Sequence, residues 1–203
     1  MTETKERILD LSLDLFSQKG YSAVSIRDIC KHVKIKESSV YYHFKNKQAI
    51  FDELLCRFQK TADAMIEQLE ASLMADQKQL GDEFYMSICD RYFENYLMDD
   101  FCNKVMRLML IEQFNNKNVK RMYDYWMFIK PLEFQSNIFQ TLMKIGLIAK
   151  SDSEYISIKY YTPIFFFAQK WLFSGELSEE NKSSFRKEAY KHIQLFFSEI
   201  GGI

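Results

Sequence analysis

Helix-breaking residues are scarce throughout this chain, which has only 6 glycines and 2 prolines among 203 residues. Residues 47–75 contain neither, and Asn46 before them is a good N-cap residue, so this stretch predicts one uninterrupted helix about 40 Å long. The abundance of Leu, Ile, Phe, Met, Glu and Lys favours helices elsewhere as well. We therefore expect an all-α fold, and the 47% hydrophobic content supports a substantial core.

The N-terminal residues contain two helical patterns. From Lys5 to Lys19 apolar residues recur with the helical period, and Gly20 stands where a left-handed C-cap belongs. Ser25 and Asp28 have the spacing of a capping box and predict a short second helix over residues 26–33. Two helices are thus expected before residue 34.

A third short helix is expected over residues 37–43, after a turn at residues 34–36. Its Val40 and the following Phe44 are four residues apart and should face the first two helices, because so small a module has little core to spare. The sequence from Arg27 to Lys47 carries six basic and two acidic residues, and the first 50 residues have a net charge of +3 against −4 for the rest. This asymmetry indicates a polyanionic partner, although charge alone would fit an ordinary solvated surface.

Two short helices joined by a short turn, the second basic and aromatic, are typical of a helix-turn-helix whose second helix enters the major groove of DNA. The face opposite Val40 and Phe44 presents hydroxyl and imidazole groups that can bond to base edges or phosphates. This face consists of Ser38, Ser39, Tyr42 and His43, with Lys36 and Lys47 at its ends.

Residues 5–50 resemble the DNA-binding domain of the TetR (tetracycline-repressor) family of bacterial transcription regulators. The resemblance lies in RILDLSLDLFSQKGYSAVSIRDIC followed by VYYHFKNKQAIF. It implies that Tyr41, Tyr42 and His43 face DNA and that Lys47 contacts a phosphate at the start of the fourth helix. The expected DNA-binding set is Ser25, Lys36, Ser38, Ser39, Tyr41, Tyr42, His43 and Lys47.

The resemblance further implies about nine helices in two domains: a DNA-binding domain at residues 1–47 and a helical effector-binding and dimerisation domain at residues 48–203. The turn departs from the family pattern of Ala-Gly-Val-Ser, because this chain has Val33-Lys34-Ile35-Lys36. Without the glycine, either Lys34 adopts a left-handed conformation at a cost of about 1 kcal/mol or the turn is reshaped. Without the serine, Ser38 or water must satisfy the first amides of the third helix.

Two of these positions have a second interpretation, and so does Arg27, a possible phosphate contact beside them. Tyr41 could be a core ring with only its hydroxyl exposed, and His43 could cap the third helix. For Arg27 we favour pairing with a neighbouring carboxylate over contact with a phosphate.

The resemblance also implies dimerisation through the last two helices, and the sequence agrees with this. Residues 160–173 are apolar nearly all round, and the final helix carries an apolar stripe, so one face can meet the body and another a partner. The alternative is a wholly internal helix in a monomer. The expected dimer residues are Phe167, Trp171, Phe185, Ala189, Ile193 and Phe196.

The C-terminal region is rich in Phe, Tyr and Met, which are suited to lining an adaptable apolar cavity but serve equally as ordinary core. Glu112 could orient a cationic or hydrogen-bonding ligand or point to water. The candidate effector-binding residues are Glu112, Trp126, Phe134, Tyr161 and Phe166.

Other functional classes lack their signatures. No metal-ligand spacing, phosphate-binding loop or catalytic motif occurs, so we expect no cofactor, no metal and no enzymatic activity. The four cysteines are far apart and predict buried, reduced thiols in a cytoplasmic protein. No stretch is long and apolar enough to predict a membrane span.

The sequence thus predicts a homodimeric cytoplasmic repressor released from a palindromic double-stranded DNA operator by a small apolar or aromatic effector. A rival hypothesis keeps the DNA-binding module but makes the body a platform for a protein partner, with no small-molecule effector. Activation in place of repression stays open, because its sign depends on where the operator lies relative to a promoter.

Overall fold

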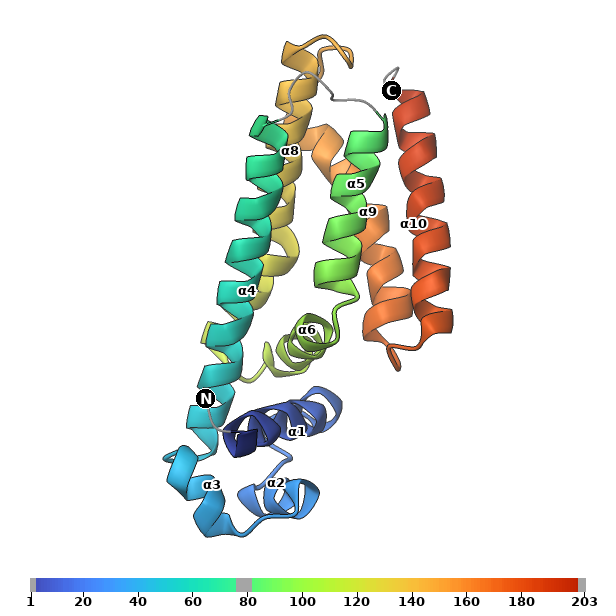
Figure 1. Cartoon of the computed structure of the whole chain (residues 1–203). Helices are drawn as coiled ribbons and strands as arrows, with labels where there is room; N and C mark the ends of the chain where they lie inside the picture. The colour runs from blue at the N-terminus through green and yellow to red at the C-terminus, as the bar shows by residue number, and fades with distance from the viewer. Residues whose placement is uncertain (1–2, 76–81, 201–203) are drawn as a thin grey trace. The chain divides into compact units, whose positions relative to one another are not determined.

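The computed structural model describes residues 3–75 and 82–200, and within these ranges the only regular elements are helices (Figure 1). The α-helices are α1 (Glu3–Lys19), α2 (Ile26–Val33), α3 (Glu37–His43), α4 (Lys47–Ala75), α5 (Asp82–Tyr92), α6 (Asp100–Glu112), α7 (Lys117–Asp124), α8 (Lys130–Lys144), α9 (Ser153–Ala168) and α10 (Glu179–Glu199). Three π-helical segments continue α5, α7 and α9: η1 (Phe93–Leu97), η2 (Tyr125–Ile129) and η3 (Gln169–Phe173). With contiguous segments joined, the described chain has nine helices, which confirms the predicted all-α fold.

The described chain divides into two compact units. Residues 3–73 and 99–120 form the first unit, and residues 74–75, 82–98 and 121–200 form the second. The first unit therefore contains α1 to α3, most of α4 and the distant helix α6.

The predicted helix ends in the first unit are confirmed. Gly20 has a φ of +82° and follows α1. Ser25 caps α2, with its side chain accepting from the Asp28 amide while the Asp28 carboxylate accepts from the Ser25 amide. The Asn46 side chain accepts from the amide of Ala49 (2.9 Å) and so caps α4.

The π-helical segments all lie in the second unit. Pro131 could kink or break its helix, because proline lacks a backbone donor and clashes with the preceding turn. It lies in the first turn of α8, where a missing amide is tolerated, directly after η2. The π-helical turn lets the chain continue as one helix from residue 117 to 144, and the Met127 carbonyl within it accepts a hydrogen bond from the Tyr161 hydroxyl (2.8 Å).

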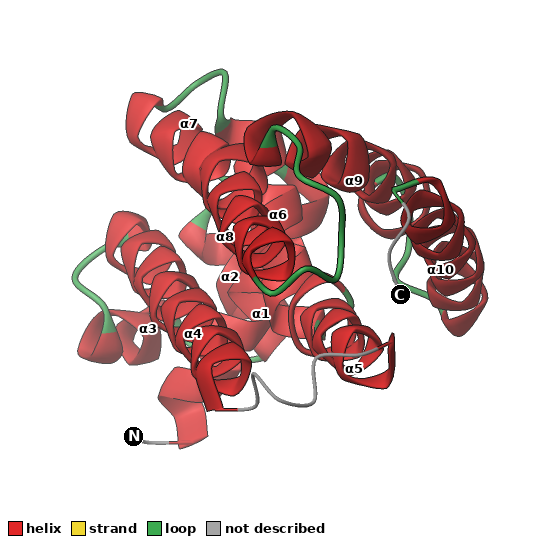
Figure 2. Cartoon of the chain, turned by 90° about the horizontal axis from the view of Figure 1, so that it is seen from above, coloured by secondary structure: helices red, strands yellow, loops and turns green. Residues whose placement is uncertain are grey.

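In the second unit α9 contacts α8 and α10, and the views in Figures 1 and 2 agree with this. Lys170 pairs with Glu188 (3.0 Å) near one end of the α9–α10 pair and Lys159 with Glu199 (3.9 Å) near the other, so the two helices run antiparallel. Aromatic rings fill the space between the helices. Among the cysteines, Cys30, Cys89 and Cys102 are buried as predicted, whereas Cys56 is exposed on the outer face of α4.

Candidate nucleic-acid interface

The turn between α2 and α3 has the strained backbone that the missing glycine predicted. Lys34 adopts φ 62° and ψ 46°, and it is the only non-glycine residue with a positive φ in the described part of the chain. Its amide and that of Ile35 both donate to the Cys30 carbonyl, the latter at 3.1 Å. Arg7 of α1 donates to the Val33 carbonyl (3.2 Å). These bonds offset the strain, and no pattern in the sequence pointed to Arg7.

The start of α3 has no side-chain cap. Lys36 occupies the N-cap position in an extended conformation, and Ser38 does not take over the role of the missing serine. The amide of Ser39 instead donates to the Lys36 carbonyl (3.0 Å). Ser38 is exposed, so its hydroxyl stays available to another partner.

The two faces of α3 differ as predicted. Val40 is fully buried and Phe44 is 5% exposed, whereas Tyr42 is 83% exposed. Tyr41 is half exposed, so it is neither a buried core residue nor a fully exposed residue like Tyr42. The Tyr42 ring stands edge-on to that of His43, with centroids 4.9 Å apart. Four exposed lysines lie on and around this helix: Lys31, Lys34, Lys36 and Lys45.

Lys47 has partners within the chain where we expected a phosphate. Its ammonium donates to the carbonyls of Tyr21 (2.8 Å) and Val24 (2.6 Å), and it lies 4.0 Å from the centre of the Tyr21 ring. Burial lowers the pKa of Lys47, while the Glu112 carboxylate acts in the opposite direction. Lys47 thus fixes the segment between α1 and α2.

Arg27 pairs with Glu37 of α3 (3.3 Å), as favoured from the sequence. The Arg27 side chain is 87% exposed, so the pair contributes little to stability. His43 is half-buried in the last turn of α3, where Phe44 is the C-cap residue.

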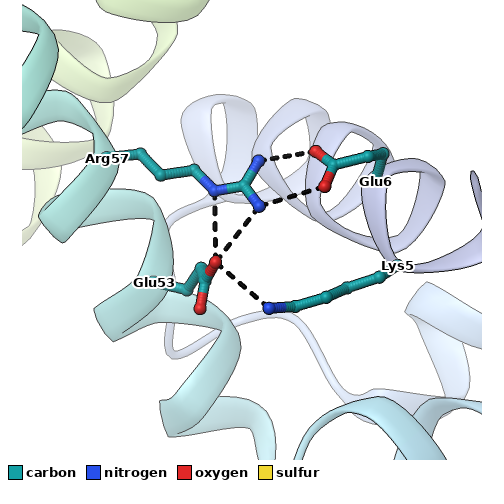
Figure 3. Close-up of polar contacts among 4 residues, drawn as sticks. All are labelled: Lys5, Glu6, Glu53 and Arg57. Carbon is teal, nitrogen blue, oxygen red and sulfur yellow. Dashed lines mark hydrogen bonds and ion pairs between the residues drawn. The ribbon is translucent and has the colours of Figure 1, made fainter. Parts of the chain in front are cut away.

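A four-residue network ties α4 to the start of α1 (Figure 3). The Arg57 guanidinium donates to both carboxylate oxygens of Glu6 (2.6 and 3.1 Å) and to Glu53 (3.1 Å). Lys5 donates to the same Glu53 oxygen (3.2 Å). Bidentate pairing of this kind fixes orientation as well as distance.

Glu112, an expected effector-binding residue, is only 4% exposed and lies in the first unit. Its carboxylate accepts a hydrogen bond from the backbone amide of Tyr21 (2.8 Å). This carboxylate therefore holds the turn after α1, in the same unit as α3.

The other four candidates for effector binding lie in the second unit. Trp126, Phe134 and Tyr161 are buried, and the Tyr161 hydroxyl donates to the carbonyl of Met127 (2.8 Å). Phe166 is 59% exposed on α9, which does not suit a residue that lines an interior site.

Most of the expected dimer residues are already covered within one chain. Four of them are buried, and rings of the same unit pack on them, such as Phe93 on Phe185 (5.0 Å) and Tyr160 on Phe196 (5.2 Å). The apolar stripe of α10 therefore belongs to the core, which leaves Phe185, Ala189, Ile193 and Phe196 little surface for a partner contact. Trp171 is half-buried and donates to Glu188 (3.1 Å), and Phe167 is half-buried beside Phe166.

Within the described ranges, no group of three or more His, Cys, Asp or Glu side chains is arranged to hold a metal ion. No helix in the described part of the chain is both long and apolar enough to cross a membrane.

The fold and this site define an all-helical DNA-binding protein with an N-terminal helix-turn-helix. Residues 8–54 match the family model described as "Bacterial regulatory proteins, tetR family". The chain therefore carries the DNA-binding domain of this family in its N-terminal residues and is a DNA-binding transcriptional regulator.

Similar proteins span nearly the whole chain. The "Biofilm operon icaADBC HTH-type negative transcriptional regulator IcaR" of Staphylococcus aureus (strain Newman) is 28% identical over 201 residues, which cover 95% of this chain and 98% of IcaR. A TetR-family transcriptional regulator from Marinobacter aquaeolei VT8 has a TM-score of 0.68 at 20% identity, covering 98% of this chain and 92% of that one. SmeT, the repressor of the Stenotrophomonas maltophilia multidrug efflux pump SmeDEF, has a TM-score of 0.61 at 14% identity, covering 96% and 89%. The last two likenesses concern the fold alone.

Proposed function

We propose that this chain is a homodimeric repressor that binds a palindromic operator through α3 and is released by a small apolar or aromatic effector. The observation that carries the proposal is the exposed, basic and aromatic face of α3, with Tyr42 at its centre. Repression is proposed because IcaR, which is similar over almost the whole chain, is a negative regulator.

For the dimer contact we propose exposed apolar residues of α9 and α10 in place of the buried stripe of α10. Tyr155, Ile158 and Phe166 lie on one side of α9, at 61%, 48% and 59% exposure, and Leu195 of α10 is 55% exposed. An exposed apolar surface on two adjacent helices suits a self-complementary contact. A two-fold dimer has recognition helices roughly 34 Å apart on a palindromic operator.

The effector is proposed to bind within the second unit, where tyrosine hydroxyls from three helices lie together. Burial raises the pKa of Tyr161, and the neighbouring Tyr92 and Tyr123 add to this effect. Gln169 donates to the Tyr123 hydroxyl (3.4 Å). Neutral hydroxyls among apolar rings suit an effector with an apolar body and a few hydrogen-bonding groups.

The decisive experiment is titration of the full chain against the intergenic DNA beside its own coding sequence, with scrambled DNA as control, at two salt concentrations. Selective binding with a strong salt dependence is expected, and Tyr42→Ala should weaken it about ten-fold. Tyr125→Ala, an exposed tyrosine in the second unit, is the matched control and should bind like wild type. Equal affinity for both DNAs, or no effect of Tyr42→Ala, contradicts the proposal.

The effector is sought by a thermal-shift screen against apolar metabolites and aromatic compounds. A saturable rise in melting temperature, together with weaker operator binding in the presence of the same compound, supports an effector-released repressor. A compound that stabilises the chain and leaves operator affinity unchanged argues against release by that compound.

A further inference from the structure

The segment between α1 and α2 is held from two sides by residues that are distant in sequence. Lys47 of α4 donates to the carbonyls of Tyr21 and Val24, while Glu112 of α6 accepts from the Tyr21 amide (2.8 Å). Both backbone polar groups of Tyr21 therefore have a fixed partner. The N-cap of α2, Ser25, follows four residues later.

The contact with Glu112 leaves little room for change. Gly20 has a φ of +82°, and a Cβ atom added there would lie 2.8 Å from Glu112 Oε1 and 3.1 Å from Ile111. The absence of a side chain at residue 20 thus lets α6 approach the backbone at the end of α1. Because Glu112 is deeply buried, water cannot take its place as the acceptor of the Tyr21 amide hydrogen bond.

A second contact fixes how far α6 is displaced along α1. Lys104 of α6 pairs with Asp14 of α1 (2.7 Å). Lys104 and Glu112 are about two helical turns apart on α6, and Asp14 lies seven residues before Tyr21, which follows the end of α1. Both contacts therefore form together only when α6 lies along α1 in one register. A shift of α6 by one turn, about 5.4 Å, breaks both.

We propose that Glu112 is a positioning residue for DNA binding. Its carboxylate oxygen accepts a hydrogen bond from the Tyr21 amide and so fixes the segment between α1 and α2. That segment determines where α2 lies, and α3 packs against α2. The inference rests on the proposed operator binding but concerns a residue of α6, far from the DNA-facing helix in sequence. It depends on a hydrogen-bond acceptor at the right distance, and not on negative charge as such.

Three substitutions separate an acceptor role from a charge role. Glu112→Gln keeps an oxygen at the same reach and loses the charge, Glu112→Asp keeps the charge and shortens the side chain, and Glu112→Ala loses both. Glu67→Ala, which removes an exposed carboxylate of α4, is the matched control. All are made in the full chain, and circular dichroism verifies that each is folded.

Two readouts are used: hydrogen–deuterium exchange of the Tyr21 amide, and affinity for the intergenic DNA. In Glu112→Asp and Glu112→Ala we expect exchange about ten-fold faster and DNA binding about ten-fold weaker, because the amide loses a buried acceptor. Glu112→Gln and Glu67→Ala should match wild type in both. If Glu112→Ala does not fold, the comparison of Glu112→Gln with Glu112→Asp still separates an acceptor role from a charge role.

Opposite results identify which hypothesis fails. Wild-type exchange in Glu112→Asp and Glu112→Ala overturns the inference, and so does a Gln variant that is more defective than Asp, since charge would then matter more than the acceptor. Faster exchange without weaker DNA binding overturns the role in positioning. If wild type itself shows no selective DNA binding, the proposed function fails, while the exchange experiment still tests the bond.

Discussion

Both units of the chain contain ion pairs and packed aromatic rings, but in different proportions. In the first, charged side chains meet specific partners: Arg57 forms a bidentate pair with Glu6, and Lys47 donates to two backbone carbonyls. In the second, aromatic rings fill the interior, with Phe139 and Tyr160 both packed on Phe196. Directional contacts favour one arrangement of helices, whereas apolar rings can be repacked at modest cost. We therefore expect the first unit, which carries the DNA-binding module, to be more rigid than the second.

The largest expected effect tests the aromatic interior. Phe185→Ala should destabilise the chain by about 3–5 kcal/mol, because the ring is fully buried against Phe93. Phe166→Ala, at an exposed ring, should leave the free energy of unfolding of the monomer nearly unchanged but weaken self-association. Urea denaturation and sedimentation at two protein concentrations measure these quantities. A stable but monomeric Phe185→Ala protein would restore Phe185 to the dimer contact.

The next prediction tests the directional contacts of the first unit. Lys47→Met should cost about 2 kcal/mol, because two carbonyls lose a charged donor. Lys45→Met changes an exposed lysine nearby and should have almost no effect. The free energies of unfolding from urea denaturation decide the matter, and equal values for the two variants would show that the Lys47 bonds contribute nothing net.

A smaller effect of opposite sign is expected at the strained turn. Lys34→Gly should raise the free energy of unfolding by roughly 0.5–1 kcal/mol, since glycine adopts the left-handed conformation without a steric penalty. The same change at Lys31, inside α2, should lower it by about 1 kcal/mol. If both substitutions lower the free energy of unfolding, the left-handed conformation of Lys34 costs less than the conformational entropy that a glycine loses there on folding.

The smallest effect concerns pH. The hydrogen bonds from Arg57 lower the pKa of Glu6 below its ordinary value of 4.5. This pair therefore stabilises the folded chain fully above the ordinary pKa, and the contribution is lost as pH falls through the lower folded value. Glu6→Gln should reduce stability by less than about 1 kcal/mol at pH 7, because the pair is partly exposed, and the difference from wild type should shrink toward pH 3. Unfolding measured from pH 7 to 3 tests this, and a difference that grows on acidification contradicts it.

The sequence was most informative where one residue determines a local conformation. Gly20 after α1, the Ser25–Asp28 box and Asn46 before α4 each predicted a helix end correctly, because a cap depends on neighbours a few residues away. The missing turn glycine even located the strained residue, Lys34. Such features need no knowledge of the tertiary fold.

The sequence was least informative where the partner lies far along the chain. An apolar stripe on α10 indicates burial but does not say whether the covering surface belongs to the same chain, so Phe185 and Phe196 were assigned to a dimer. A lone carboxylate such as Glu112 likewise gives no sign that its partner is an amide 91 residues earlier. The roles of Tyr42 and of the tyrosines in the second unit stay predictions.

The presence of α6 in the first unit has a consequence for engineering. A hybrid regulator made by grafting residues 1–47 onto a foreign body would leave behind Lys104 and Glu112, and with them the partners of Asp14 and the Tyr21 amide. A working graft should transplant two segments, residues 1–73 and 99–120, or choose a recipient whose corresponding helix carries a hydrogen-bond acceptor with the reach of Glu112 at the same place. The portable part of this protein is thus discontinuous, and cutting the chain at one point does not isolate it.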